Sequence, residues 1–229
     1  MSQMLKSIAV LIFFIVVTHL IYIGLIRPEA AILIEAAKEA GQSSPRDLFV
    51  ILKDYEQEIC IILMGWGVFL IISKCLAILK DRYLFTIDLL EASSTDSSSL
   101  EGALISLEEL PENIRKTSLV TALTSSLLRF SITKDVQNTS DAIESSMNAL
   151  ALKQEAENSM IRYLIWAIPS IGFIGTVRGI GQALSQADQA LAGDISGMTD
   201  SLGVAFNSTF VALLISIFLM FSETYWQGF

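Results

Sequence analysis

Four long apolar segments dominate the pattern of hydrophobic and polar positions along the 229-residue chain. A helix of about 20 residues crosses the roughly 30 Å hydrocarbon core of a bilayer, so each segment is long enough to span a membrane. The first segment could alternatively be a signal peptide. However, only Lys6 precedes its long apolar run, and no small-residue cleavage site follows before Arg27 and Pro28. We therefore predict a retained anchor and four transmembrane helices, over residues 8–26, 59–79, 163–184 and 202–221.

Outside these segments the chain is predicted to be helical, because no alternating run is long enough to form a sheet. Residues 44–47, Ser-Pro-Arg-Asp, are typical of a helix N-terminus, and the helix predicted from Ser44 continues into the second span. Pro111 is predicted to open a further helix, after a serine-rich break at residues 93–99. Asp141 is predicted to begin a helix that enters the third span without a break. Its 44 residues would measure about 66 Å, so about half of it would project from the bilayer.

The distribution of Lys and Arg predicts the orientation, because these residues favour the cytoplasmic side. The loop at residues 185–201 has three aspartates and no Lys or Arg, whereas Lys74, Lys80 and Arg82 cluster at the end of the second span. This loop is predicted to lie outside, with both termini cytoplasmic and residues 27–58 external, although the external stretch holds four basic residues beside seven acidic ones. The fold class is an all-α integral membrane protein with a helical cytoplasmic domain between the second and third spans. The predicted divisions are residues 1–58, 59–79, 80–162 and 163–229.

Composition supports a membrane protein, since 52% of the residues are hydrophobic and 17% are charged, against about 25% charged in ordinary globular proteins. This apolar content excludes a disordered chain, two cysteines are too few for a disulfide scaffold, and a net charge of −9 excludes a nucleic-acid binder. The sequence has no nucleotide-binding loop, metal-ligand spacing or nucleophile–base pair, so we expect neither an enzyme nor a bound cofactor or metal. No Asp or Glu lies inside an apolar segment, so we expect this chain to offer no carboxylate midway across the bilayer.

The third span contains the most informative segment, Pro-Ser-Ile-Gly-Phe-Ile-Gly-Thr-Val-Arg-Gly-Ile-Gly over residues 169–181. Gly172, Gly175 and Gly179 fall on one helical face, where glycine lets neighbouring backbones approach closely. Pro169 removes one helical hydrogen bond and is predicted to kink the span, which membrane proteins tolerate when a neighbour satisfies the freed carbonyl. Both features predict close helix packing.

Two threonines are predicted to lie at the same depth in the bilayer. Thr176 is 13 residues into a span entered from the cytoplasm, about 20 Å up, and Thr209 is 7 residues into a span entered from outside, about 10 Å down. Together with Asn207 and Ser208, these hydroxyls could line a thin hydrated path. The alternative is that they bond carbonyls one turn back or hold helices together, and on the threonine and glycine pattern alone this alternative is favoured.

Arg178 and His19 are two of the other polar residues in the spans. Arg178 is 15 residues into the third span, close enough to the outer face to reach water. It lies about 200° around the helix from Thr176 and is predicted to face a neighbouring subunit, lipid headgroups or an external vestibule. A structural role or a vestibule charge is favoured there over direct ion handling. His19, the only histidine, is predicted to make a hydrogen-bonded helix contact.

The segment of residues 169–181, followed by a short loop and a small-residue span bearing Thr209, resembles the proton-channel family that includes MotA, TolQ and ExbB. The resemblance implies a channel subunit of the bacterial inner membrane that forms a homopentamer around two copies of a single-span partner. That partner bears the membrane aspartate, and Thr176 and Thr209 line the ion route. The fourth span departs from the pattern, because it lacks a proline and holds Ser216 instead.

The predicted function is that of an ion-channel subunit of a stator-type motor, which uses ion-motive force to drive the single-span partner. The proton is the favoured ion, although threonine hydroxyls also serve sodium. The partner would decide whether the motor drives import, envelope maintenance, motility or defence. The alternative is a non-conducting helical membrane scaffold or receptor subunit, in which the glycines and threonines only pack helices.

Overall fold

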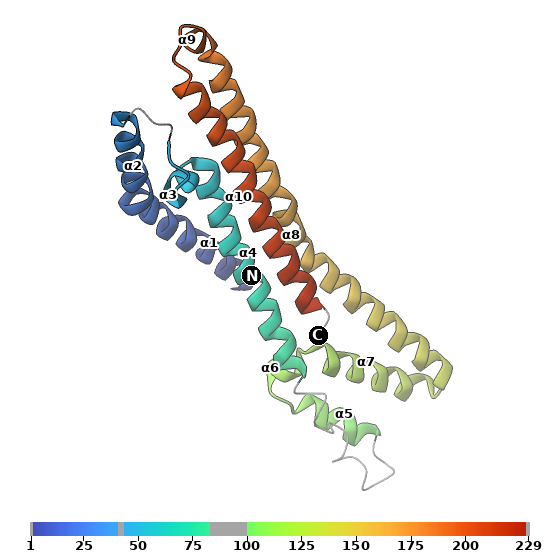
Figure 1. The fold of residues 1–229 in the computed structure, drawn as a ribbon. Coiled ribbons are helices and arrows are strands. Elements are labelled where there is room, and N and C mark those ends of the chain that lie inside the picture. The colour runs from blue at the N-terminus through green and yellow to red at the C-terminus, as the bar shows by residue number, and fades with distance from the viewer. Residues whose placement is uncertain (1, 41–43, 83–99, 228–229) are drawn as a thin grey trace. The chain divides into compact units, whose positions relative to one another are not determined.

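The computed structural model describes residues 2–40, 44–82 and 100–227, and every regular element in these ranges is a helix (Figure 1). Among these described residues, four helices are long and apolar enough to cross a membrane, which confirms the predicted all-α fold class with four spans. These spans are Leu5–Glu39, Tyr55–Leu79, Val136–Ser185 and Ser196–Tyr225. The elements are α1 Ser2–Ile21, η1 Tyr22–Ile26, α2 Arg27–Glu39, α3 Leu48–Leu52, α4 Tyr55–Arg82, α5 Leu100–Glu108, α6 Glu112–Arg115, α7 Ser118–Thr133, α8 Val136–Ser185, α9 Ala187–Leu191 and α10 Ser196–Gln227.

The chain divides into two compact units. The first consists of Met1–Ile72 and Met160–Phe229, and the second is Ser73–Ser159. Two of the long helices, α4 and α8, each contribute residues to both units. The candidate site lies wholly in the first unit. The serine-rich break predicted at residues 93–99 lies outside the described residues.

The first span does not end at Arg27, because α1, η1 and α2 follow one another without a break from Ser2 to Glu39. The π-helical turn η1 precedes Pro28, and the backbone N–H of Arg27 bonds the carbonyl of Tyr22, five residues back. A proline inside an α-helix clashes with the carbonyl four residues back, and a π-turn relieves such crowding by widening the helix. Residues 27–39, which were predicted to follow the first span, therefore continue the helix of that span.

The prediction of a helix from Ser44 into the second span is wrong in two respects. Helix α3 begins at Leu48, because the Asp47 carboxylate caps it by accepting the backbone N–H of Phe49 at 2.9 Å. It ends at Leu52, the chain bends, and a separate helix, α4, begins at Tyr55. The first turn of α4 contains Glu56 and Glu58, and acidic residues there interact favourably with the helix dipole.

The helix boundaries of the second unit follow local caps. Pro111 directly precedes α6, which confirms the helix start predicted there. Lys134 ends α7 in a left-handed conformation with φ of 52°, and the Asp135 carboxylate accepts the backbone N–H of Gln137 at 2.9 Å. The unbroken helix predicted from Asp141 into the third span is present, but because of this cap it begins at Val136 and runs for 50 residues.

Helix α10 begins in a similar way. The Asp194 carboxylate accepts both the hydroxyl of Ser196, at 2.6 Å, and its backbone N–H, at 3.1 Å. These hydrogen bonds stabilise the ionised carboxylate and lower the pKa of Asp194 below its usual range. The preceding turn uses Gly193 at φ of +103°, a conformation that L side chains rarely adopt.

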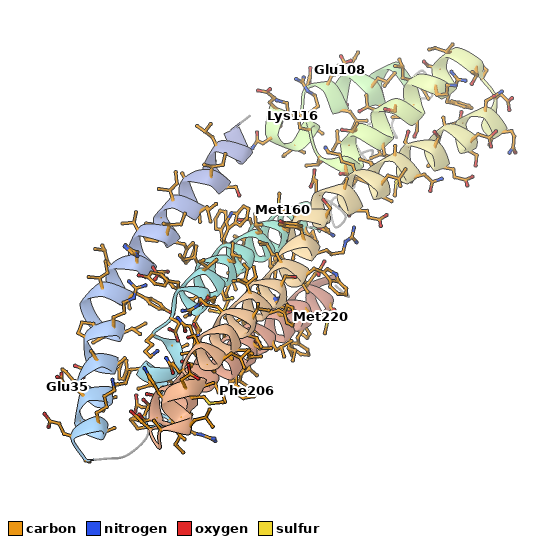
Figure 2. All side chains as sticks on the ribbon, turned by 90° about the horizontal axis from the view of Figure 1, so that it is seen from above. Glu35, Glu108, Lys116, Met160, Phe206 and Met220 are labelled. Carbon is orange, nitrogen blue, oxygen red and sulfur yellow. The ribbon has the colours of Figure 1, made fainter. Side chains whose placement is uncertain are left out.

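The core of the first unit lies between α4, α8 and α10, where Cys60, Ile168, Ala212 and Leu219 are buried together. The outer surface is apolar as well. Phe206 and Met220, labelled on α10 in Figure 2, are exposed, and only between 11% and 33% of each span window is buried inside the chain. Apolar faces of this extent are expected to contact lipid or other chains.

Candidate functional site

Three of the four glycines of the third span, Gly172, Gly175 and Gly179, bring α8 and α10 into close contact. A Cβ atom added to Gly172 would lie 2.5 Å from the Cβ of Ala212, and one added to Gly175 would lie 2.5 Å from the Cβ of Ser208. At Gly179 the nearest atoms include two of the backbone, the nitrogen of Ala205 at 2.7 Å and the carbonyl oxygen of Ser201 at 2.8 Å, beside the Cβ of Ala205 at 2.8 Å. No larger residue fits these positions without separating the helices.

We expect Gly179→Ala to destabilise the α8–α10 pair by about 1–3 kcal/mol, the usual cost of overpacking. The added methyl group would meet backbone atoms, which cannot turn away as a side chain can. The matched control is Gly181→Ala, because a Cβ at Gly181 meets nothing within 4 Å. Thermal unfolding of the purified chain in mild detergent measures both variants. Equal melting temperatures for the two would show that the glycine face does not set the helix separation.

The hydroxyls of Thr176 and Thr209 meet between α8 and α10 and are hydrogen-bonded to each other. Thr176 Oγ1 also lies 3.0 Å from the carbonyl oxygen of Ala205, and Thr209 Oγ1 lies 3.2 Å from that of Gly172. Each hydroxyl has one proton and two lone pairs, so each can donate within the bundle and still accept from another donor. The structure thus joins the two threonines that the depth argument placed at one level.

Ser216 satisfies the carbonyl that Pro169 leaves free. Because Pro169 has no N–H, the carbonyl of Ile165, four residues back, has no helical partner. The Ser216 hydroxyl on α10 donates to that carbonyl at 2.8 Å. The residue at which the fourth span departs from the family pattern therefore compensates for the proline in the third.

We expect Ser216→Ala to cost about 1–3 kcal/mol, because it strands the Ile165 carbonyl in an apolar core. In a Pro169→Ala background the same substitution should cost little, since the new alanine restores the backbone N–H that bonds the carbonyl of Ile165. The measurement is a double-mutant cycle of unfolding free energies in mild detergent. A cycle in which the two substitutions simply add would show that the serine does not act through this carbonyl.

Arg178 pairs with carboxylates of its own chain, partners that the sequence did not indicate, and its place at an external vestibule stays a prediction. Its Nε lies 2.7 Å from Oε1 of Glu56 and its Nη2 lies 2.8 Å from Oε2, which is a bidentate pair. Nη2 also lies 3.6 Å from the carboxylate of Asp54. The start of α4 covers the face of α8 that the helical rotation assigns to Arg178.

Three consecutive polar side chains at the start of α4 are buried: Glu56 (7% exposed), Gln57 (0%) and Glu58 (5%). Glu56 packs against α8, with its Cγ 3.2 Å from the position of a Cβ at Gly175. Glu56 therefore lies beside the residue that precedes Thr176, a carboxylate close to the threonine pair that the apolar-segment count did not include. The signal was present in the sequence as Glu-Gln-Glu directly before an apolar run, but counting apolar windows discards such residues.

Glu58 joins the first span to the second. Its Oε1 lies 2.6 Å from Nδ1 of His19, and its Oε2 lies 2.6 Å from Nη2 of Arg27. The guanidinium of Arg27 also lies over the ring of Tyr55, 4.4 Å from its centroid. The hydrogen-bonded helix contact predicted for His19 is thus present, with a glutamate as its partner.

Gln57 connects the start of α4 to Ser208 on α10. Its Nε2 donates to the carbonyl of Ile51 at 3.1 Å and to the hydroxyl of Ser208 at 3.3 Å. Ser208 is itself buried and donates to the carbonyl of Val204 at 2.9 Å. Its neighbour Asn207 is half-buried and makes no hydrogen bond to this group in the described part of the chain. The structure thus brings together Thr176, Thr209 and Ser208 but not Asn207.

Within residues 2–40, 44–82 and 100–227, no group of three or more His, Cys, Asp and Glu side chains could hold a metal ion. The polar groups between the spans are hydroxyls, amides and charge-paired carboxylates.

These features define a class: a multi-pass helical membrane protein whose last two long helices pack through glycines and share a pair of threonine hydroxyls. The model of the MotA/TolQ/ExbB proton channel family matches residues 112–228, just over half of the chain, and the chain belongs to this family. Comparisons with curated proteins and with solved structures gave no significant match. Family membership supports an ion-channel role in a membrane, and the family is one of channels rather than of enzymes.

Proposed function

We propose that this chain is the channel subunit of a stator-type motor in the bacterial inner membrane, with the proton as the conducted ion. Thr176 and Thr209, with Ser208 beside them, would line the route, and Arg178 would contribute its charge near the outer mouth. The observation that carries the proposal is the direct hydrogen bond between the two threonine hydroxyls across α8 and α10. Hydroxyls that donate and accept at the same time can pass a proton along.

The proposal includes a partner that supplies the carboxylate. Glu56 and Glu58 are near the route, but an arginine binds each of them. Each of these carboxylates is thus already engaged in a charge-assisted contact within its own chain. We therefore propose that a homopentamer surrounds two copies of a single-span protein with a membrane aspartate.

The second candidate is a non-conducting scaffold or receptor subunit. The observation in its favour is that both threonine hydroxyls have backbone acceptors within the bundle, so they can serve helix packing alone. The two candidates differ in whether the assembled complex passes ions.

The test is purification in mild detergent, mass measurement of the intact assembly, and reconstitution into vesicles that contain a pH-sensitive dye. The proposal predicts a mass of five copies of this chain and two copies of a small protein, together with proton uptake under an imposed membrane potential. An assembly of that composition that passes no protons in any orientation or potential would favour the scaffold.

A further inference from the structure

We propose that Gln57 and Ser208 hold a water molecule beside the threonine pair, which would make the second span a third wall of the ion route. The inference rests on the proposed function, since it extends that route from α8 and α10 to the start of α4. It begins from one atom: Oε1 of Gln57 is buried and has no hydrogen-bond partner among the described residues. An unpaired buried amide oxygen is costly, so a donor is expected to bind there.

The orientation of the Gln57 amide is fixed by its neighbours. Nε2 lies 3.1 Å from the carbonyl oxygen of Ile51, which can only accept a hydrogen bond. A flipped amide would place Oε1 against that carbonyl, with two acceptors facing each other. The free atom of the amide is therefore its oxygen.

The hydrogen bonds of Ser208 leave it as an acceptor too. Its single proton is directed to the carbonyl of Val204, and one lone pair receives Nε2 of Gln57. A second lone pair remains on the same oxygen. Ser208 Oγ thus keeps a free lone pair 3.3 Å from Nε2 of the Gln57 amide, whose Oε1 is also a free acceptor, and no donor of either side chain remains unused. Such a pair binds a species that donates hydrogen bonds or bears positive charge.

The surrounding charges favour the same kind of ligand. Glu56 and Glu58 flank Gln57 in the chain, and both are buried. Each neighbouring carboxylate has its own basic partner. Glu56 pairs with Arg178, and Asp54 pairs with Lys53. Glu58 contacts both Arg27 and His19. Gln57 thus has carboxylates on both sides, and among the described residues no cation contacts its amide. The Gln57 amide oxygen and the carboxylates beside it therefore attract a water molecule whose hydrogens point toward them. Their negative charge also favours a positively charged, protonated water at this place.

The position fits a step of the route. Ser208 precedes Thr209 in α10, and its side chain packs on Gly175, the residue before Thr176. Water held by Gln57 and Ser208 would therefore lie next to the hydroxyl pair, on the side toward the carboxylates of α4. Two oxygen acceptors could also bind a sodium ion, and the test below distinguishes sodium from water.

The test uses the assembled complex in dye-loaded vesicles and compares Gln57→Met with the unmodified complex. Methionine keeps the length of the side chain and removes the amide, so we expect proton flux to fall about tenfold, as for the loss of a hydrogen bond to a buried polar group. The matched control is Ser7→Ala, which removes the 3.0 Å hydrogen bond of the Trp66 indole elsewhere in the bundle. Ser7→Ala should change the flux by less than about twofold, because a typical hydrogen bond contributes little net free energy and this one lies away from the proposed route.

Wild-type flux in an assembled Gln57→Met complex would overturn the inference. A different result would contradict the proposed function itself: normal conduction by a complex that lacks both threonine hydroxyls. If Gln57→Met does not assemble, a high-resolution density map of the unmodified complex decides: a peak within hydrogen-bond distance of Oε1 of Gln57 supports the site, and its absence overturns it. Loss of flux when choline replaces sodium would assign the site to sodium and overturn the water assignment.

Discussion

The double substitution Thr176→Val with Thr209→Val is expected to abolish ion conduction and to leave the complex assembled. Valine has the β-branched shape of threonine, so we expect the close packing at Gly172 and Gly175 to be kept while both hydroxyls are removed. The path would then be dry at the level where the two side chains now bond each other. Because a polar species without partners in an apolar layer costs several kcal/mol, we expect the flux to fall by at least about 100-fold. The measurement is dye-reported proton uptake by vesicles under an imposed potential.

The matched control for the threonines is Thr199→Val. Thr199 lies on the same helix as Thr209, is exposed, and its hydroxyl bonds the carbonyl of Ile195 one turn back, at 2.9 Å. Its replacement should leave the flux unchanged. Each single valine variant of the pair should lie between the unmodified and the double variant, because one hydroxyl remains. Normal conduction by an intact double-variant complex would identify the threonines as packing residues and favour the scaffold.

The features that followed from sequence are those that helix geometry fixes locally. Counting residues into each span placed Thr176 and Thr209 at one level, and the 3.6-residue period placed Gly172, Gly175 and Gly179 on one face. A membrane strengthens such arguments, because span length and depth are tied to the bilayer thickness. The requirement for a partner at the carbonyl freed by Pro169 was also foreseeable from backbone chemistry alone.

The features that sequence missed depend on how separate helices meet. Arg178 and Glu56 are 122 positions apart, and nothing local in either segment indicates the other. Glu56 and Gln57 lie just before the apolar run of the second span, so a window count places them outside the bilayer level of the threonines. The bend after α3 and the packing of the start of α4 on α8 bring them to it. The helix start predicted at Ser44 was wrong because Asp47, three residues later, provides the N-cap instead.

The second large effect is expected at the ion pair between Arg178 and Glu56. Arg178→Met would leave the Glu56 carboxylate buried beside α8 without its bidentate partner. Removing one member of a buried pair costs about 3–5 kcal/mol. Because Arg178 is 36% exposed, water would partly solvate the stranded charge, and we expect a loss of about 2 kcal/mol. Thermal unfolding of the chain in mild detergent measures this loss as a lower melting temperature.

Removing the second charge should reverse most of that loss. In Arg178→Met with Glu56→Met, no charge is stranded, and apolar replacement of a buried pair is often neutral or stabilising. The double variant should therefore melt near the unmodified chain, although Gln57 and Ser208 would then lie in a less polar surrounding. If the double variant is as unstable as Arg178→Met alone, the loss comes from the missing guanidinium contacts themselves, including the one to Asp54. If it recovers stability but conducts poorly, the pair serves the electrostatics of the route rather than the attachment of α4 to α8.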